Sequence, residues 1–366
     1  MIFNHITKFT RRFYQPIVGY WKRNIYYVSD SSKWAFYWIA NYLARNIYIQ
    51  HKKKVHIVWD IRGLRNQIIH FGNRYAYLKD SQFTVVHPSN KIFLTWLHGD
   101  PSDPNPQMQY LLTVLPKASN YVEKIVVSCD ITAKTLLDLN IPNNKLLKIP
   151  LGVDLSVFHQ PNIQIRQKTR ARFGIKTDFL CIGSFQKDGI GWGEGAEPKM
   201  VKGPDIFLEV MANLVKRYNN ILVILTGPAR GYVKKGLEKL GIPYLHNFLS
   251  NYHYLVSYYQ VLDLYIISSR CEGGPLPLLE SWATGVPLVS TRVGMPADLI
   301  RHRENGMIAD IEDIQGLTDH TIELIENEAL RNKCRQNGME EVKKYDWPLI
   351  AEAYYNKLYS PFLEKK

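Results

Sequence analysis

The sequence predicts an α/β protein with two Rossmann-like parallel-sheet domains that face an interdomain cleft. Short, nearly continuous apolar runs, which are typical of strands buried on both faces, alternate with helical patterns in both halves of the chain. A linker-like stretch, 151–172, separates the two series, and 366 residues suffice for two domains with cores of their own. Because ligands of such sheets bind at the carboxyl ends of the strands, we expect the binding site between the two halves.

The first series spans residues 55–155 and is expected to form the N-terminal domain. It begins with the apolar run 55–60, and a turn around Gly63 leads into a helical stretch that ends near residue 77. Further strands are expected at 82–87, 92–97, 124–128 and 145–150, and helices at 107–118 and 131–139. This repeated strand–helix alternation predicts a parallel sheet.

The second series spans residues 156–345 and is expected to form the C-terminal domain. Its strands are expected at 179–185, 221–226, 262–268, 286–290 and 307–309, and its helices at 204–218, 231–240, 253–261, 276–283, 313–326 and 328–344. A Gly- and charge-rich loop, 186–203, follows the first strand, and Pro204 occupies the favoured first position of the next helix. The remaining residues, 346–366, are expected to form a final amphipathic helix and a tail.

Residues 1–54 form a separate extension in this interpretation, because they are both basic and aromatic. They contain ten Lys and Arg residues and one acidic residue, whereas the remainder of the chain holds 36 basic and 32 acidic side chains. Their most apolar run, 34–44, is about half as long as the ~20 residues that a membrane-spanning helix needs. No signal-peptide cleavage site follows that run.

Three interpretations of this extension remain open. Lys and Arg interleaved with Trp and Tyr suit a segment, residues 1–50, that lies on an anionic membrane surface, and the protein would then be cytoplasmic and peripheral on the inner face of the membrane. The aromatic side chains would otherwise pack on the main body, or the segment would be a nucleic-acid-binding arm. Because the charge excess is confined to one end of the chain, we expect no nucleic acid among the partners.

The cysteines and acidic residues give no sign of a metal or a redox cofactor. The four cysteines lie far apart without a C-x-x-C spacing, which favours a reducing compartment over a disulfide framework or zinc. There is no metal-type His/Cys cluster and no Asp-x-Asp pair of the kind that holds a metal–diphosphate. The G-x-G-x-x-G signature is absent after the run 55–60, which argues against an NAD site. We therefore expect no cofactor and no metal.

The stretch 268–294 contains the strongest signal of a site. Seven residues separate Glu272 from Glu280, with a Gly-Gly-Pro turn after the first and the second inside a predicted helix. The free N–H groups and the dipole at the start of that helix favour an anion. Two carboxylates around such a helix start suit a charged, hydroxyl-rich ligand. The alternative is a strand–turn–helix connection with a capping Glu.

Three more residues follow predicted strands and would face the cleft. Lys202 precedes the helix that starts at Pro204, where a lysine suits a phosphate or diphosphate, and Lys187 in the same loop adds a second positive charge. His98 ends a strand and is followed by Gly99. The alternatives are solvated lysines in a basic protein and a structural histidine.

Together these motifs resemble the retaining family 4 glycosyltransferases (glycosyl transferases group 1), which have the GT-B fold. The similarity covers about residues 179–359, and the segment 152–158 is similar to the interdomain segment of that family. The pieces that carry the similarity, in the family's order, are Lys202-Gly203-Pro204-Asp205, Thr226-Gly227, Tyr258–Ile266, Glu272–Glu280, Pro287–Ser290, Gly294 and Asn305-Gly306. The N-terminal half is only loosely similar, and residues 1–50 are not similar.

The resemblance implies a role for each candidate residue. Glu280 would accept hydrogen bonds from the nucleotide ribose, Glu272 would contact hydroxyls of the donor sugar, and Lys202 would neutralise the diphosphate as it leaves. His98 would lie near the donor sugar. The other donor-binding residues would be Gly273, Gly274, Leu276, Gly227, Gly63 and Lys187. The final helix would cross back to the N-terminal domain.

Three departures from the family pattern concern the donor. Lys187 follows the strand after which the family usually has an Arg, and a lysine is a point charge without a bidentate fork. Pro275 stands where the family often has Gly, so one amide donor is lost. The glycine-rich turn of the N-terminal domain is reduced to Gly63.

The resemblance implies a metal-independent glycosyltransferase that moves a sugar, with retention, from a nucleotide-diphosphate sugar to a glycan or lipid-linked acceptor. The lysine and the helix dipole would stabilise the charge that develops on the diphosphate. The nucleotide sugar would be a co-substrate, and polysaccharide biosynthesis would be the setting. Alternatives on the same architecture are a sugar-nucleotide epimerase and a non-catalytic sugar-nucleotide-binding protein.

Overall fold

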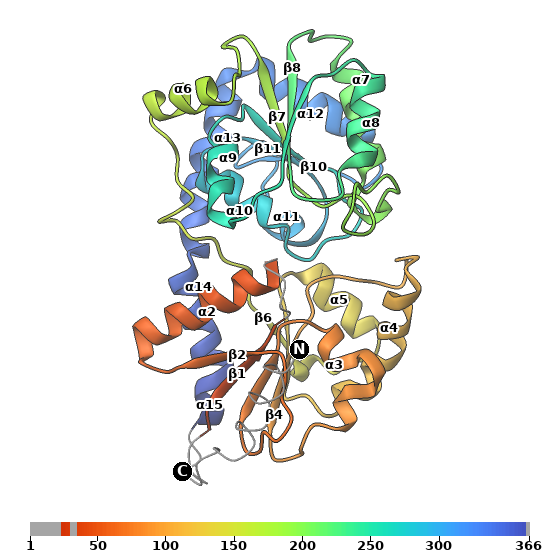
Figure 1. The fold of residues 1–366 in the computed structure, drawn as a ribbon, viewed down its shortest axis with the longest axis vertical. Helices are drawn as coiled ribbons and strands as arrows, with labels where there is room; N and C mark the ends of the chain where they lie inside the picture. The colour runs from red at the N-terminus through yellow and green to blue at the C-terminus, as the bar shows by residue number, and fades with distance from the viewer. Residues whose placement is uncertain (1–22, 30–34, 364–366) are drawn as a thin grey trace, which may run out of the picture.

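The computed structural model, which describes residues 23–29 and 35–363, has two domains, each built around a six-stranded parallel sheet. The domains are stacked along the long axis of the molecule, and helices flank the sheet of each domain (Figure 1). The predicted pair of Rossmann-like domains is therefore confirmed.

The N-terminal sheet has the strand order β2-β1-β3-β4-β5-β6. Its strands are β1 (Ile25–Val28), β2 (Val55–Val58), β3 (Ile68–Phe71), β4 (Lys91–Thr95), β5 (Lys124–Val127) and β6 (Leu146–Lys148). Its helices are α2 (Ala35–His51), α3 (Tyr75–Leu78), α4 (Pro106–Ser119) and α5 (Asp130–Asp138). Ile68, Phe93 and Ile125, on three neighbouring strands, are fully buried, as expected of a parallel sheet that is covered on both faces.

Strand β1 and helix α2 come from the segment that the sequence predicts to be an extension, so the domain boundary at residue 54 is wrong. β1 lies between β2 and β3, with Ile25 paired to both Val55 and Ile68. One face of α2 is buried, including Leu43 and Ile47. Aromatic residues dominate this stretch, and they are as compatible with a buried strand as with a surface segment.

The interpretation in which the aromatic residues pack on the main body is therefore right for β1 and α2. The predicted membrane contact of residues 1–50 now concerns residues 1–22, which lie outside the described part of the chain. Within the described residues, no helix combines the length and the apolar character that crossing a membrane requires.

Two further N-terminal elements differ from the sequence prediction. Strand β3 lies inside the stretch that is predicted to be helical, and Lys79–Thr84 forms a 3-10 turn where the sequence predicts the start of a strand at 82–87. An apolar run of four residues is compatible with either a helix or a strand, so periodicity does not decide between them. His70 of β3 is buried and lies 2.6 Å from Tyr359 Oη and 2.8 Å from Thr95 Oγ1, which fixes the strand at the centre of the domain.

The C-terminal sheet has the strand order β12-β11-β10-β7-β8-β9. Its strands are β7 (Leu180–Ser184), β8 (Ile221–Thr226), β9 (Tyr244–Asn247), β10 (Leu264–Ile267), β11 (Leu288–Thr291) and β12 (Met307–Ala309). Its helices are α6 (Ile163–Arg172), α7 (Pro204–Leu214), α8 (Gly231–Lys239), α9 (Leu255–Tyr259), α10 (Leu276–Ala283), α11 (Gly294–Leu299), α12 (Ile314–Glu326) and α13 (Glu328–Glu341). The elements that the sequence analysis does not predict include the half-exposed edge strand β9 and helix α6, which lies inside the expected linker.

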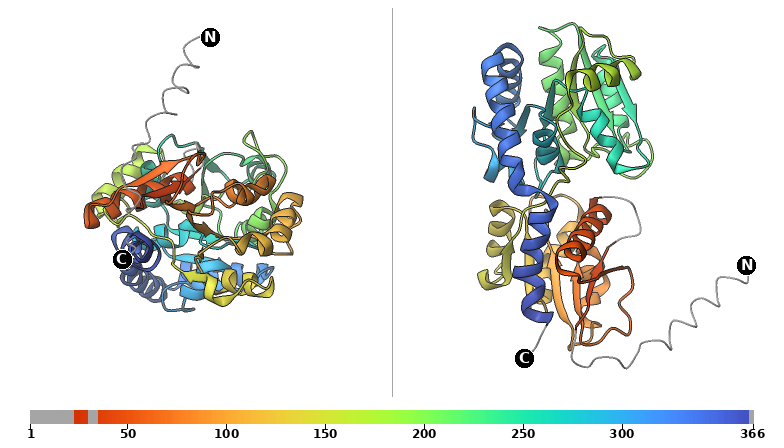
Figure 2. Two further views of the ribbon diagram at one scale, coloured as in Figure 1. Left: turned by 90° about the horizontal axis from the view of Figure 1, so that it is seen from below. Right: turned by 90° about the vertical axis from the view of Figure 1, so that its left-hand side faces the viewer.

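The chain ends with a helical segment that returns to the N-terminal domain, as the resemblance implies. α14 (Trp347–Tyr354), a π-helical turn (Tyr355–Tyr359) and α15 (Ser360–Leu363) follow one another. Figure 2 shows this segment running along the side of the molecule from one domain to the other. α14 packs on α2, where Tyr42 stacks on Trp347 with ring centroids 5.3 Å apart. The returning helix therefore fixes α2 beside the domain interface.

Candidate active site

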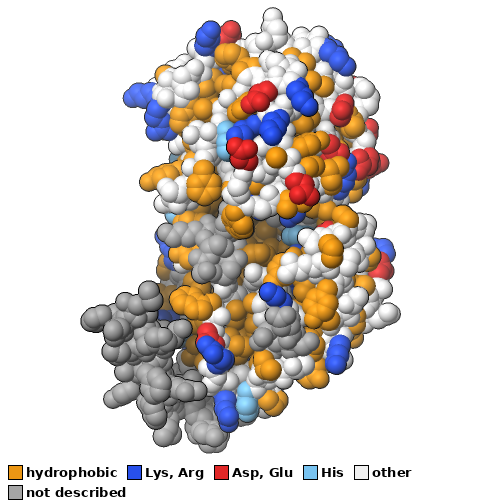
Figure 3. All heavy atoms as spheres, turned by 45° about the vertical axis from the view of Figure 1, so that its right-hand side comes forward, with side chains coloured by type: hydrophobic (Ala, Val, Ile, Leu, Met, Phe, Trp, Pro, Cys, Tyr) orange, Lys and Arg blue, Asp and Glu red, His pale blue; other side chains and the backbone are white. Residues whose placement is uncertain are grey.

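The glycine turn that follows β10 touches the N-terminal domain directly. Figure 3 shows the molecule hollowed between its two domains. A Cβ atom on Gly273 would lie 1.3 Å from the carbonyl oxygen of Leu97, just after β4, and a Cβ atom on Gly274 would lie 2.7 Å from the side chain of Leu151. Only glycines allow the two backbones to approach this closely. The two predicted turn residues therefore lie at the domain interface.

Lys202 and Glu272 form an ion pair at this interface. Lys202 Nζ lies 2.6 Å from Glu272 Oε1, and the two side chains are 15% and 8% exposed. The hydroxyl of Ser269 donates a second hydrogen bond to Glu272 Oε1 at 3.1 Å. Gly203, with a φ of 59°, ends the 3-10 turn that carries Lys202 and lets α7 start immediately after it. Glu272 thus holds Lys202 at the start of α7. A ligand that binds Lys202 would compete with this carboxylate for the lysine.

His98 approaches this ion pair from the N-terminal domain. Burial lowers the pKa of His98 well below its usual value, and the charges of Arg74, Lys202 and Lys199 lower it further. The imidazole is therefore neutral at pH 7, with one ring nitrogen as a hydrogen-bond donor and the other as an acceptor. The structure thus brings together His98, Lys202 and Glu272, which the sequence analysis places in one cleft.

Two basic residues that the sequence analysis does not identify belong to the same cluster. Burial, followed by the charges of Lys202 and Lys187, lowers the pKa of Lys199 to about 8, and Glu272 opposes this shift. Arg74 follows β3 and is 2% exposed. Lys199 can be found from the sequence, because its spacing of three residues from Lys202 places both lysines on one side of a 3-10 turn. Arg74 cannot, because the pattern does not reveal β3.

Glu280 is enclosed by aromatic side chains. It is 1% exposed, and it accepts hydrogen bonds from the hydroxyls of Tyr252 and, at 2.7 Å, Tyr259. Trp38 of α2 packs on Tyr252, with ring centroids 5.5 Å apart. The N-terminal domain therefore covers the second carboxylate of the motif.

The burial of Glu280 predicts a pH-dependent stability. Burial raises the pKa of Glu280 from its ordinary value of 4.5 to about 7, and the hydrogen bonds from Tyr252 and Tyr259 oppose this shift. Between these two values the folded protein holds a proton that the unfolded chain has released, so the free energy of unfolding falls as pH rises through this range. Glu280→Gln cannot ionise, and we expect its stability relative to the wild type to increase between about pH 5 and pH 7.5, by at most about 3 kcal/mol.

Urea unfolding of the wild type and Glu280→Gln at several pH values in this range measures the effect. Tyr252→Phe serves as a control, because it removes one hydrogen bond to Glu280 and keeps the ionisable carboxyl group. A constant difference between the wild type and Glu280→Gln across the range would contradict the burial of a protonated Glu280.

The loop between β7 and α7 is anchored by a buried ion pair. Arg230 and Asp188 have side chains that are 0% and 1% exposed, and Arg230 Nη2 lies 2.9 Å from Asp188 Oδ2. Arg230 also donates to the carbonyl oxygens of Ser184 (2.6 Å) and Thr226 (3.0 Å), at the ends of β7 and β8. The long Gly-rich loop is therefore fixed to the carboxyl ends of two strands.

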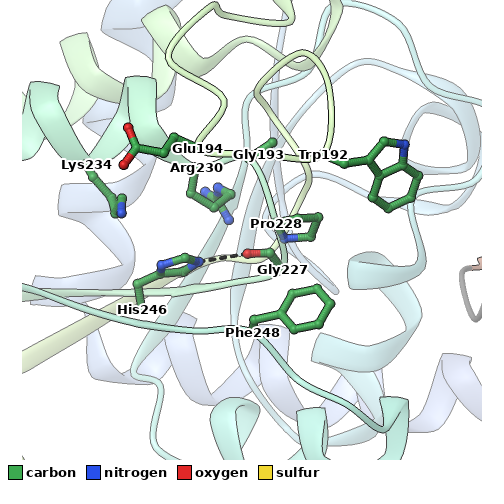
Figure 4. A pocket seen from close by; sticks show the side chains of 10 residues that line it. Trp192, Gly193, Glu194, Gly227, Pro228, Arg230, Lys234, His246 and Phe248 are labelled. Atoms are coloured by element: carbon green, nitrogen blue, oxygen red, sulfur yellow. Dashed lines mark hydrogen bonds between the residues drawn. The ribbon is translucent and has the colours of Figure 1, made fainter.

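A cavity of about 330 Å³ lies between this loop and the ends of β8 and β9. Its lining includes Trp192, Glu194, Gly227, Lys234, His246 and Phe248. Trp192 and Phe248 are 62% and 67% exposed, and Figure 4 shows both rings beside the Gly227-Pro228 backbone. Lys187 Nζ lies 4.5 Å from the centroid of the Trp192 ring, and burial lowers the pKa of Lys187. Gly227 and, through Trp192, Lys187 therefore belong to this second part of the site.

Leu276 and Gly63 lie in different parts of the structure. Leu276 is the first residue of α10, directly after the glycine turn, so its backbone lies beside the domain interface. Gly63 lies in an exposed turn after the edge strand β2, and no atom would lie within 4 Å of a Cβ at this position. The segment 29–34, and not the Gly63 turn, follows the interior strand β1. The role of Gly63 as the remnant of a glycine-rich donor turn stays a prediction.

The described residues hold no group of three or more His, Cys, Asp or Glu side chains that is arranged to bind a metal ion. The four cysteines are not paired in disulfides.

The C-terminal domain matches a known protein family. Residues 197–341 match the family model described as glycosyl transferases group 1. This part of the chain is a group 1 glycosyltransferase domain. The matched range includes Lys199, Lys202, Glu272 and Glu280, whereas His98 and Arg74 reach the interface of the glycosyltransferase domain from outside it.

Curated relatives match parts of the chain. A probable sucrose-phosphate synthase from Vicia faba is 36% identical over 108 residues, which are 27% of this chain and 10% of the relative. A D-inositol 3-phosphate glycosyltransferase from Corynebacterium urealyticum is 28% identical over 212 residues, which are 55% of this chain and 48% of the relative. The chain therefore spans between about a tenth and about half of the length of these curated relatives.

Solved structures match nearly the whole chain. HepE from Anabaena, in complex with UDP and glucose, superimposes with a TM-score of 0.73 and 14% identity, covering 92% of this chain and all of HepE. A sucrose-phosphate synthase from Thermosynechococcus elongatus superimposes with a TM-score of 0.66 and 17% identity, covering 80% of this chain and 74% of that protein. The protein thus has the GT-B fold.

Proposed function

We propose that this protein is a retaining glycosyltransferase that transfers a sugar from a UDP-sugar to the hydroxyl group of an acceptor. The observation that carries the proposal is the cluster of Lys202, Glu272 and His98 where the group 1 domain meets the N-terminal domain. Support for a uridine nucleotide comes from HepE, which was solved with UDP, with UDP and glucose, and with UDP-glucose.

The cluster supplies the groups that glycosyl transfer needs. The reaction develops positive charge at the anomeric carbon and negative charge on the departing diphosphate. Lys202 and the amides of the turn before α10 would stabilise that negative charge, so the reaction would need no metal. Glu272, released when the diphosphate takes Lys202, would accept hydrogen bonds from sugar hydroxyls. A neutral His98 would hydrogen-bond the donor sugar without placing another positive charge near the anomeric carbon.

For the acceptor we propose a glycan or a lipid-linked sugar. Residues 1–22 contain four basic and no acidic side chains, which supports an anionic membrane surface as the place where the acceptor is presented. Sedimentation with anionic liposomes, with and without residues 1–22, tests this part of the proposal. Equal binding of the two forms would contradict it.

A screen of nucleotide-diphosphate sugars tests the proposed function. We expect UDP-sugars to raise the melting temperature of the full chain and to be hydrolysed slowly without an acceptor, and transfer to an acceptor to preserve the anomeric configuration as read by NMR. A chain that binds no nucleotide sugar would contradict the proposal. Epimerisation of the free donor would indicate an epimerase, and binding without hydrolysis or transfer would indicate a non-catalytic binder.

The cavity beside Gly227 is our proposed site for the nucleobase. Trp192 and Phe248 are large aromatic rings that stay exposed at its edge, and a base stacked on them would remove apolar surface from water. Stacking of a base on an aromatic side chain contributes about 1–3 kcal/mol, so we expect Trp192→Ala to weaken UDP binding by roughly tenfold. Isothermal titration with UDP measures the change, and Trp59→Ala, at an exposed tryptophan next to β2, is the control. An unchanged affinity in Trp192→Ala would exclude the stacking role.

A further inference from the structure

Arg74 carries a buried guanidinium that has no carboxylate partner among the described residues. It follows β3 and is 2% exposed. Its guanidinium carbon lies 5.0 Å from the ring centroid of Trp96 and 5.1 Å from that of Tyr75. Arg74 Nε has no hydrogen-bond partner among the described residues, and no carboxylate of that part of the chain lies within ion-pair distance of Arg74. In the described part of the chain, the charge is therefore covered by aromatic rings and meets no carboxylate.

Arg230 shows how the same chain satisfies a buried arginine. Arg230 is 1% exposed, pairs with the carboxylate of Asp188, and donates to two backbone carbonyl oxygens at the ends of β7 and β8. Its role is to hold a loop in place. Arg74 makes no comparable set of contacts, so a structural role of this kind does not account for it. Stacking on aromatic rings offsets only part of the cost of burying a charge.

Arg74 lies close to the domain interface, because its guanidinium stacks on Trp96, and the next residue, Leu97, has the carbonyl oxygen that meets the Gly273 turn. Burial lowers the pKa of Arg74, and the groups that oppose this shift are Tyr75 first, through its charge and a side-chain hydrogen bond, and then Cys271, in the loop after β10, and Asp103, in the loop before α4. Arg74 in turn lowers the pKa of His98. Arg74 therefore lies on the N-terminal side of the cleft, within reach of both His98 and the C-terminal loop that carries Glu272.

We propose that Arg74 binds an oxyanion, a phosphate or a carboxylate, that a substrate brings into the cleft. A guanidinium presents paired N–H donors that match either group, and it stays charged in a buried position where a lysine would lose its proton. The proposal rests on the proposed function, because it adds a further cationic group to the cleft that contains Lys202 and Lys199. The oxyanion belongs either to the donor diphosphate, which Arg74 would hold from the side opposite to Lys202, or to an acidic acceptor.

Titrations of the full chain with uridine, UDP and inorganic phosphate separate the two sources. Arg74→Gln is the test variant, Arg74→Lys replaces the fork of N–H donors by a single amine whose charge burial disfavours, and Arg65→Gln removes an exposed charge from the same domain. We expect uridine affinity to be equal in all four proteins, because uridine carries no phosphate. If the donor diphosphate is the partner, Arg74→Gln weakens UDP binding by about tenfold or more, with Arg74→Lys intermediate.

If an acidic acceptor is the partner, UDP binds equally well to all variants. The UDP-saturated wild type then binds inorganic phosphate, and Arg74→Gln loses this binding by the same factor of about ten. Equal affinities of the wild type and Arg74→Gln for both UDP and phosphate would overturn the proposal. Replacing an arginine that is merely structural would have no effect that is specific to ligands with an oxyanion. If the wild type binds neither uridine nor UDP, the proposed function fails, and the phosphate titration of the nucleotide-free protein still tests Arg74. Circular dichroism of each variant checks its folding, and Arg74→Lys carries the test if Arg74→Gln does not fold.

Discussion

Lys202→Ala is expected to lower kcat by roughly 10²–10³, which is the typical cost of removing one preorganised group that stabilises developing negative charge. Lys202 Nζ is held 2.6 Å from Glu272 in a largely buried position, so the charge is in place before the reaction starts. The effect should be larger in kcat than in KM, because the charge on the diphosphate grows as the sugar leaves.

Steady-state release of UDP from the donor identified by the nucleotide-sugar screen measures this prediction. Lys235→Ala is the matched control, because Lys235 is an exposed lysine on α8 in the same domain. Lys202→Arg keeps the charge but changes its geometry, and we expect an intermediate rate. A kcat of Lys202→Ala within about twofold of the wild type would remove Lys202 from the catalytic machinery.

The sequence predicts the elements of the C-terminal domain better than those of the N-terminal domain. The reason lies in the length and composition of individual strands. β8 is a six-residue apolar run between clear turn signals, whereas β1 and β3 have four residues each. β1 also lies in a basic, aromatic segment whose composition suits a surface as well as a strand. A strand of this length is defined by the neighbours with which it pairs, and the partners of β1 are 30 and 43 residues away along the chain.

The parts of the site also differ in how far a local sequence pattern reveals them. Lys202, Glu272 and His98 follow strands that the sequence reveals, and the carboxyl ends of parallel strands bring them together. The enclosure of Glu280 depends on Trp38 of α2, which reaches across the domain interface to pack on Tyr252. No local pattern contains this contact, because it requires both the placement of β1 and the closing of the two domains. The sequence therefore indicates which residues share the cleft but not which of them are covered.

The second large effect is expected from Gly273→Ala. The added methyl group would lie 1.3 Å from the carbonyl oxygen of Leu97, so the turn and the N-terminal domain must separate by roughly 2 Å to restore an ordinary contact. The separation would move His98 away from the Lys202–Glu272 pair. A misplacement of about 1 Å at a reacting centre costs about 10²-fold in rate, so we expect kcat/KM to fall by at least about 10².

Gly273→Ala tests the close contact between the domains separately from the hydrogen-bond donors of the turn. Alanine keeps the backbone N–H of residue 273, so any amide donor is retained, and the backbone of Gly273 has no positive φ that alanine would strain. UDP affinity should therefore stay within about threefold of the wild type if the C-terminal domain alone binds UDP, and it should fall further if Arg74 also holds the diphosphate; transfer is lost in both cases. Gly241→Ala is the control: it adds the same methyl group in open space at the end of α8, where its φ of 68° should cost about 1 kcal/mol of stability without affecting kcat. If Gly273→Ala retains transfer within about tenfold of the wild type, the closed contact between Leu97 and the turn is not the reactive arrangement, and the active geometry must be a more open one.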